Sequence, residues 1–306
     1  MPDTNANIAN ANIAEQSAQV EASVPQEQSA LAQFEVGTYV TFGRYPQNNG
    51  DTPEPIEWLV LDNDGQTALL FSKYGLDSQP FHQKDAGVNW RDCSLRQWLN
   101  RRFFSKAFDE AEQSLIEVST IQTDDYLKHY EKLSAALGGK IGAADLDESF
   151  ENGVQEYYET QDKVFCLSVR EALKYFGNEK ESDGCKEVWY SAACESEERV
   201  NRDLACKATA YALRRSADIP KRWKEYRKKN FEWWFDNANF WLRSPGYCGD
   251  CVYHGDYCGM HSAAVDQFGI IHGYNSNGYW MNNYCVAVRP ALRVKLQWAS
   301  AYNIFP

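Results

Sequence analysis

The chain has 306 residues, a formal net charge of −12 and a pI near 5.0, and 43% of its residues are hydrophobic. This length can bury a large core and corresponds to about two domains at ~150 residues each, although one β-rich domain can reach ~250. The acidic balance argues against nucleic acid or an anionic membrane as the main partner, because phosphate binding needs a basic face. No apolar run approaches the ~20 residues of a membrane span, so we expect none.

Residues 1–33 differ in composition from the rest of the chain. They are rich in Ala, Asn, Gln, Ser and Glu and contain no Lys, Arg or aromatic residue. Such a stretch buries too little apolar surface to offset its ordering entropy, so we expect a disordered tail, and a second tail at 298–306. The start Met-Pro-Asp-Thr lacks the cationic and apolar regions of a signal peptide. Either the chain is cytoplasmic when made or it begins after a removed leader, which leaves cytoplasm, cell surface and virion open.

The first part of the chain after this tail reads as strands followed by helices. Alternating apolar residues predict strands at 38–42, 56–61 and 66–72, and Asn63-Asp64-Gly65 predicts a hairpin turn because Asp-Gly supplies positive φ. Helical spacing then predicts helices at 94–99 and 109–116.

The middle of the chain is less regular. Residues 131–161 are ambiguous, and the acidic run 145–149 fails the calcium-loop pattern because Phe150 stands where that loop needs Gly. A short buried strand is predicted at 164–167, and Ser168 with Glu171 predicts a capping box that opens a helix ending near Phe176. Residues 204–216 look helical. Half of the residues from Arg214 to Lys229 are basic, which could bind an anion or an acidic partner, although a solvated face that balances the acidic surface is favoured.

The segment 247–285 is unlike the rest of the chain. It holds six Tyr, six Gly, four of the nine Cys, three of the five His, four Asn and three Asp, but no Lys, Arg or Glu. Tyr supplies large contact area at low entropy cost, and Ser, Gly, Asn and Asp supply adaptable hydrogen bonds. Lys and Glu are depleted at interface cores, where desolvating a charge is expensive. The composition therefore predicts a binding surface.

The genetic code offers a second, compatible cause. Asn codons whose two adenines are randomised yield Tyr, His, Asp, Asn, Ser, Cys, Gly and similar residues, but never Lys, Glu, Gln, Met or Trp. Only Met260, Gln267, Trp280 and Met281 in the segment fall in the forbidden set. Between the skewed residues, short strands are predicted at 263–265, 269–270 and 286–292, with turns at 266–269 and 275–278.

Seven strings in order resemble a bacterial domain family with the C-type lectin fold, related to formylglycine-generating enzymes. They are Phe42-Gly43-Arg44-Tyr45-Pro46-Gln47, Ile56-Glu57-Trp58-Leu59-Val60-Leu61, Ser94-Leu95-Arg96-Gln97-Trp98-Leu99-Asn100, Asp162-Lys163-Val164-Phe165, Lys207-Ala208-Thr209-Ala210-Tyr211-Ala212, Trp241-Leu242-Arg243-Ser244-Pro245-Gly246 and Val288-Arg289-Pro290-Ala291. Some members of this group are variable proteins of diversity-generating retroelements, which mutate adenines in a C-terminal repeat, and the chain looks like one of them.

The resemblance implies an α+β C-type lectin fold, like that of the formylglycine-generating enzymes. It would have two helices, antiparallel sheets and a long loop-rich C-terminal region that carries the binding face. One such domain would span 34–297, with an insert at about 125–235. A rigid scaffold that holds tolerant loops agrees with this expectation.

Other chemistries in the 247–285 segment have weaker support. Cys248, Cys251 and Cys258 with nearby histidines invite a zinc site, but a second well-spaced pair is missing and randomised codons yield Cys and His without metal. Their redox state, and that of Cys285, is left open between free thiols and one disulfide. A thiol oxidase of the formylglycine-generating type is the main enzyme alternative, although the spacing around Cys248 does not match that active site.

Large and charged residues in the matched strings have structural interpretations. We expect Trp241 in the core and leave Trp280 open, because Trp at such positions more often packs than forms a sugar platform. Arg243 and Arg289 are interpreted as a buried, charge-paired scaffold.

The resulting prediction is a non-enzymatic ligand-binding protein without cofactor or metal. Its ligand would be a protein or a surface glycan. The predicted binding residues share the skewed composition of the segment and are Tyr247, Asp250, Tyr253, His254, Asp256, Tyr257, His261, His272, Tyr274, Asn275, Tyr279, Asn282, Asn283 and Tyr284.

Overall fold

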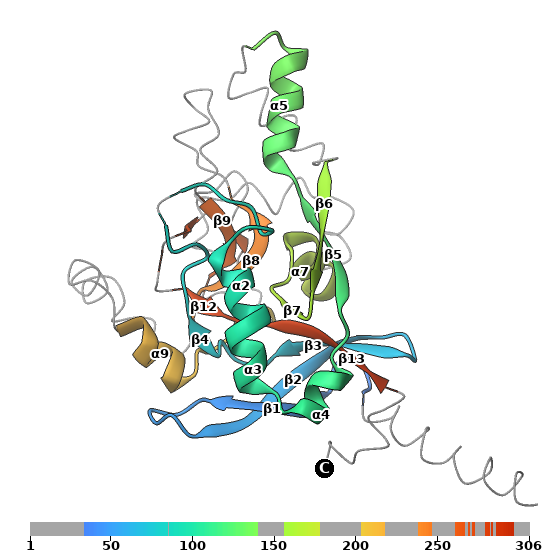
Figure 1. Cartoon of the computed structure of the whole chain (residues 1–306), viewed down its shortest axis with the longest axis vertical. Helices are drawn as coiled ribbons and strands as arrows, with labels where there is room; N and C mark the ends of the chain where they lie inside the picture. The colour runs from blue at the N-terminus through green and yellow to red at the C-terminus, as the bar shows by residue number, and fades with distance from the viewer. Residues whose placement is uncertain are drawn as a thin grey trace, which may run out of the picture.

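The computed structural model describes residues 34–84, 86–139, 156–177, 203–217, 238–246, 261–266, 269, 271–272, 279–281, 283 and 286–296. These residues form a mixed α+β structure whose sheets are mostly antiparallel (Figure 1). The tails predicted at 1–33 and 298–306 and the turn predicted at 275–278 lie outside the described residues.

A five-stranded antiparallel sheet forms the base of the fold. Its strands, in spatial order, are β1 (Tyr39–Pro46), β2 (Pro53–Asn63), β3 (Thr67–Ser72), β13 (Ala291–Lys295) and β7 (Val164–Phe165). The first three confirm the predicted strands, and the hairpin between β2 and β3 is also confirmed. Gly65 has φ +82°, and the Asp64 carboxylate accepts hydrogen bonds from the backbone amides of Gln66 and Thr67.

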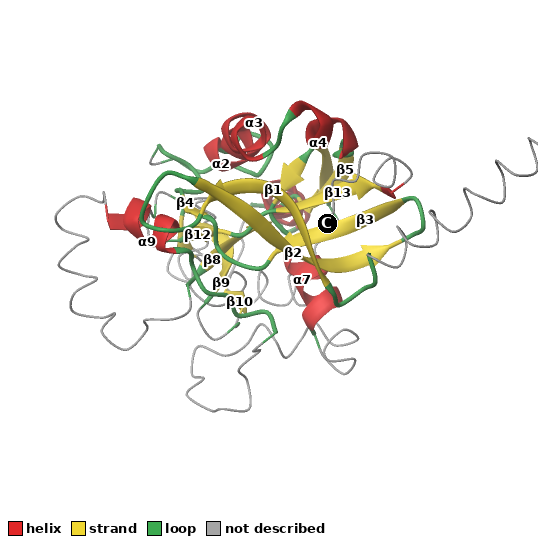
Figure 2. Cartoon of the chain, turned by 90° about the horizontal axis from the view of Figure 1, so that it is seen from below, coloured by secondary structure: helices red, strands yellow, loops and turns green. Residues whose placement is uncertain are grey.

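One long helical run covers one face of this sheet. It consists of α2 (Ser94–Trp98), a π-helical turn η1 (Leu99–Phe103) and α3 (Phe104–Ala107), and α4 (Glu110–Leu115) follows it. Figure 2 shows α2–α4 on one side of the sheet and α7 (Val169–Phe176) on the other. The run is longer than the helix predicted at 94–99, because buried Phe103 and Phe104 extend its apolar face. α4 confirms the helix predicted at 109–116, and a capping box between Asp109 and Glu112 opens it.

A second sheet packs above the first and carries the C-terminal strands. Its order is β10 (Ile271–His272), β9 (His261–Val265), β8 (Phe240–Pro245), β12 (Ala287–Val288) and β4 (Asp77–Ser78), and β11 (Tyr279–Trp280) pairs with β9. β12 and β8 run parallel, whereas the other pairs are antiparallel. The strand predicted at 286–292 is thus divided between two sheets, since Arg289 and Pro290 interrupt it.

A separate two-stranded ribbon is absent from the sequence predictions. β5 (Ser119–Asp124) and β6 (Tyr157–Asp162) pair along their full length, and α5 (Tyr126–Ala136) follows β5 and extends away from the sheets (Figure 1). The buried positions of β5 are Ser119, Ile121 and Thr123. Two of the three are polar, so the usual apolar alternation of a strand is missing.

Two further helices lie close to this core. α7 begins at the predicted Ser168 capping box, with both of its hydrogen bonds present. α9 (Ala210–Ala217) begins later than predicted, because the Thr209 hydroxyl accepts the Ala212 amide and starts the helix there. Together, β7 and α7 place parts of the expected 125–235 insert within the core.

A buried carboxylate joins the helical run to the ribbon. The Asp162 side chain is fully buried and accepts hydrogen bonds from Trp90 Nε1 at 3.0 Å, Arg96 Nε at 2.6 Å and Thr160 Oγ1 at 2.7 Å. Asn100, in the π-helical turn, is a fourth donor to Asp162 through its Nδ2. Its Oδ1 accepts a hydrogen bond from the Lys163 backbone amide. This network fixes the sequence string 162–165 against the string 94–100.

Candidate functional site

The 247–285 segment lies in the sequence between two strands of the second sheet, β8 and β12. We call these two buried strands the frame of the segment. β8 precedes the segment and is buried throughout, and β12 follows it. Trp241 is fully buried, as predicted, and its Nε1 donates to the Gln79 carbonyl at 2.8 Å. The segment therefore follows one buried strand and precedes another.

Arg243 is the central polar contact of β8. Its guanidinium is 2% exposed and makes a two-pronged ion pair with Glu171, with Nη1–Oε2 at 2.5 Å and Nη2–Oε1 at 2.8 Å. The remaining donors reach the Cys166 and Gln122 carbonyls and the Thr123 hydroxyl. The prediction of a buried, charge-paired scaffold is confirmed for this residue.

The ion pair with Arg243 lowers the pKa of Glu171. Burial alone would raise the pKa of its carboxyl, but the Arg243 charge and the hydrogen bonds from Arg243 and Ser168 hold the pKa below its ordinary value. Because Glu171 is also the third residue of α7, the same carboxylate caps that helix. One ion pair thus ties α7 to β8.

Arg289 differs from the prediction. It is buried, but within the described residues no carboxylate pairs with it. Its Nε and Nη1 donate instead to the Ser72 and Leu204 carbonyls at 2.8 and 2.7 Å, and its guanidinium lies 4.0 Å from the Phe71 ring centroid. The expected charge pair is therefore wrong here, because carbonyl dipoles and an aromatic face stabilise the cation in its place. Burial lowers the pKa of Arg289.

The start of the segment meets the start of β9. The Gly246 amide donates to the His261 carbonyl at 2.8 Å, and the Ser262 hydroxyl donates to the Leu242 and Ser244 carbonyls. A Cβ on Gly246 would lie 2.6 Å from the Ser262 carbonyl carbon, so only glycine permits this approach. Gly246 and His261, which flank residues 247–260 in the sequence, are therefore neighbours in the sheet.

Beyond β9 the chain turns back as a hairpin. Val265 pairs with Ile271, and the Gly269 amide, with φ +80° at that residue, donates to the Asp266 carbonyl at 3.0 Å, which confirms the predicted 266–269 turn. His272 Nε2 lies 2.9 Å from Asp266 Oδ2, and the His272 side chain is 26% exposed. The pair orients one imidazole toward the edge of the sheet. Asp266 and His272 flank the predicted 266–269 turn in the sequence. An acceptor and a possible donor at these two positions are a signal from which this pair could have been predicted.

The predicted binding residues are only partly described. His261 is buried at 4% exposed within β9, so its side chain contributes to the interior of the sheet; burial lowers its pKa. Tyr279 pairs with Ser262 through β11, and Asn283 is half-buried. The others lie outside the described residues and are Tyr247, Asp250, Tyr253, His254, Asp256, Tyr257, Tyr274, Asn275, Asn282 and Tyr284.

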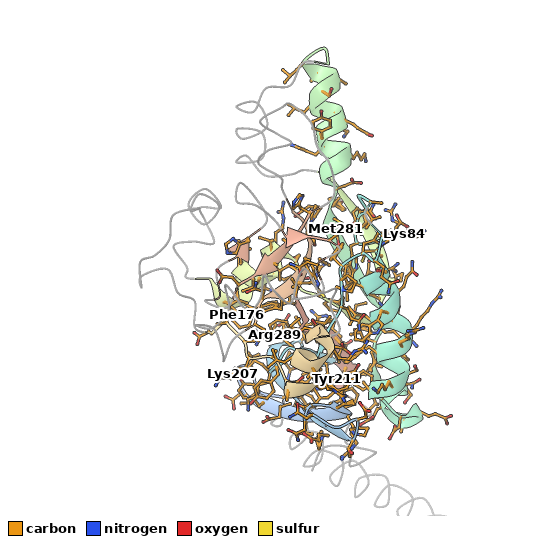
Figure 3. All side chains as sticks on the ribbon, turned by 90° about the vertical axis from the view of Figure 1, so that its left-hand side faces the viewer. Lys84, Phe176, Lys207, Tyr211, Met281 and Arg289 are labelled. Carbon is orange, nitrogen blue, oxygen red and sulfur yellow. The ribbon has the colours of Figure 1, made fainter. Side chains whose placement is uncertain are left out.

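A backbone contact joins the segment to the loop before α2, and no sequence pattern predicted it. The Met281 carbonyl accepts the His82 amide at 2.9 Å, and the Met281 side chain is buried. His82 Nδ1 in turn accepts the Ser94 amide. Met281 and Lys84 mark this junction in Figure 3.

The thiols of the scaffold are not suited to nucleophilic chemistry. Burial raises the pKa of the Cys93 thiol to about 12 and also raises the pKa values of Cys166 and Cys206. A thiol that stays protonated is a poor nucleophile. The cysteines of the predicted zinc pattern lie outside the described residues, and the described part of the chain holds no cluster of three metal-ligating side chains.

The described residues form a mixed α+β scaffold with mostly antiparallel sheets, and its buried strands β8 and β12 flank the 247–285 segment in the sequence. The family described as Domain of unknown function (DUF6273) matches residues 65–296, and the chain belongs to this family. No curated protein and no solved structure matches the chain. Among the helices that the structure describes, none has both the length and the hydropathy that a membrane crossing requires.

Proposed function

We propose that this protein binds a protein or surface-glycan ligand through the 247–285 segment, held on a scaffold of the C-type lectin fold. The segment would be diversified by a retroelement, so that its residues differ between copies while the scaffold stays constant. Recognition rests on tyrosine contact and adaptable hydrogen bonds, and no bond is made or broken in the ligand.

The composition of the segment carries this proposal. Six Tyr and no Lys, Arg or Glu occur between two strings that belong to the buried scaffold. Random surface sequence would include Lys and Glu. Depletion of these residues together with enrichment of Tyr is typical of binding surfaces.

The geometry of the frame supports the same proposal. Gly246 and His261 bring the two ends of residues 247–260 together, and Val265 with Ile271 closes the next turn. Loops closed on a buried sheet tolerate side-chain changes, because their ends are fixed by backbone hydrogen bonds and not by the side chains that vary.

Sequencing the DNA that flanks the gene is the direct test of diversification. We expect a near-copy of codons 247–285 that differs only at adenines, next to a reverse transcriptase gene. Finding neither would refute diversification and would leave the composition to be explained by a fixed binding site or by a metal or thiol site.

Alanine substitutions test the binding surface itself. A glycan array and a display library of surface proteins would first provide a ligand. Replacing Tyr253, Tyr257 and Tyr279 by Ala should then weaken binding at least about 100-fold, since aromatic anchors contribute roughly 2 kcal/mol or more each. The melting temperature should change little. A large drop in melting temperature would place these tyrosines in the core and contradict the proposal.

The thiol-oxidase alternative predicts a different result. It requires turnover that depends on oxygen or copper, and Cys248→Ser should abolish that turnover. Under the binding proposal the wild-type protein shows no such turnover. Cys248→Ser then changes only the affinity for the ligand.

A further inference from the structure

A row of cations lies on the exposed side of the α2–η1–α3 helical run. Arg101, Arg102 and Lys106 are all exposed. Within the described ranges, no carboxylate pairs with any of the three, and the guanidinium groups of Arg101 and Arg102 make no side-chain hydrogen bond. Arg102 and Lys106 are four residues apart and so face the same way. Cations without a carboxylate partner on the exposed side of the run leave a locally positive surface.

α9 extends this surface through a shared aromatic ring. Lys106 Nζ lies 5.3 Å from the Tyr211 ring centroid, and Arg214 Cζ lies 5.2 Å from the same centroid. The Tyr211 ring meets the Tyr45 ring edge-on at 5.7 Å, and the Tyr45 hydroxyl donates to buried Asp77 at 2.6 Å. Figure 3 shows α9, labelled at Tyr211, beside the helical run. The cations are therefore held on a rigid base.

Among the described residues, Arg214 and Arg215 of α9 have carboxylate partners, whereas Arg101, Arg102 and Lys106 have none. Asp51 pairs with Arg214 at 2.5 Å, and buried Asp77 lies 3.8 Å from Arg215 Nε. We name Arg101, Arg102, Lys106, Arg214 and Arg215 the basic surface. It stands out in a chain whose formal charge is −12. In Figure 1, α3 and α9 lie at the end of the molecule away from β9.

We propose that the basic surface docks an acidic segment of a partner protein. Guanidinium groups bind carboxylates through paired hydrogen bonds, and the cation–π contacts of Lys106 and Arg214 with Tyr211 limit the entropy that docking would remove. A short acidic segment responds mainly to charges within the Debye length of about 8 Å. A long polyanion also meets the remaining negative charge of the chain, which disfavours nucleic acid. This inference does not depend on the function proposed above.

The test uses the full chain and a fluorescent oligoglutamate peptide as the probe, with binding followed by anisotropy at low and physiological salt. We expect binding that weakens with salt. The variant Arg101→Glu/Arg102→Glu should weaken it about tenfold, since each reversal removes an attraction and adds a repulsion at an exposed site. The control variant Lys128→Glu/Lys132→Glu, on exposed positions of α5, changes the net charge by the same amount and should have no comparable effect.

Three results would overturn the proposal. The first is that oligoglutamate does not bind at low salt. The second is an equal loss of affinity in both variants, which would indicate an effect of net charge alone. Tighter binding of a single-stranded DNA oligonucleotide of equal charge would assign the surface to nucleic acid. Arg101 and Arg102 are exposed, so their variant should retain the wild-type melting temperature. The control loses the ion pairs of Lys128 and Lys132 with Glu156, and exposed pairs contribute only about 0–1 kcal/mol, so its melting temperature should fall slightly at most. Circular dichroism checks both.

Discussion

Replacing Glu171 by Gln should destabilise the scaffold by about 3 kcal/mol. The substitution keeps the shape of the side chain and its ability to cap α7 at the third helical position. It removes the negative charge opposite Arg243, whose guanidinium is 2% exposed, and replaces one of the two oxygens that accept from Arg243 by an amide donor. The variant therefore isolates the ion pair from the packing around it.

The magnitude follows from the contacts. Two of the five Arg243 hydrogen bonds end on the Glu171 carboxylate, and hydrogen bonds to charged groups contribute roughly 1.5–3 kcal/mol each. Breaking a buried pair from one side destabilises by roughly 3–5 kcal/mol, because a buried charge is left uncompensated. The Glu171 side chain is 29% exposed, and water reaching it reduces the loss to the lower end of that range.

Urea denaturation of wild type and variant, followed by tryptophan fluorescence, measures this difference. Glu159→Gln is the matched control, because Glu159 is exposed on β6, and it should change stability by less than about 0.5 kcal/mol. A loss below about 1 kcal/mol for Glu171→Gln would refute the reasoning. It would mean that the carbonyl and hydroxyl acceptors of Arg243 suffice to stabilise its charge.

The same pair predicts an acid dependence. The pKa of Glu171 in the folded protein lies below its value in the unfolded chain, which is about 4.3. The contribution of the pair is therefore complete above the unfolded pKa and is lost as the pH falls through the folded pKa. The stability difference between wild type and Glu171→Gln should shrink below about pH 4.5, and a difference that persists there would contradict this assignment.

Three further predictions concern the scaffold. Asp162→Asn should destabilise by about 3 kcal/mol in urea denaturation, because an amide cannot accept from all the donors that surround this carboxylate. Gly246→Ala should destabilise by about 2 kcal/mol, since its Cβ would meet backbone at 2.6 Å, whereas Gly65→Ala, in open space, should cost about 1 kcal/mol; equal losses would argue against the close approach. Cys93 and Cys166 should resist maleimide until the protein unfolds, and labelling under native conditions, read by mass spectrometry, would contradict their burial.

Local sequence patterns predicted much of the first half of the fold. The strands near 39–72 follow from alternation, the 63–65 turn from Asp-Gly, and the start of α7 from the Ser168–Glu171 spacing. Each of these features depends on residues a few positions apart. The sequence also marked 247–285 by its composition, which requires no knowledge of contacts.

The tertiary structure decided what composition and spacing could not. The β5–β6 ribbon buries polar side chains, so its pairing depends on a partner strand more than thirty residues away and not on an apolar pattern. Arg243 and Arg289 look alike in sequence, yet one meets Glu171 and the other meets carbonyls and the Phe71 ring. Which acceptor surrounds a buried cation is set by chain segments far apart in sequence. The sequence therefore shows that a buried arginine is present, but its partners are determined only when the sheets assemble.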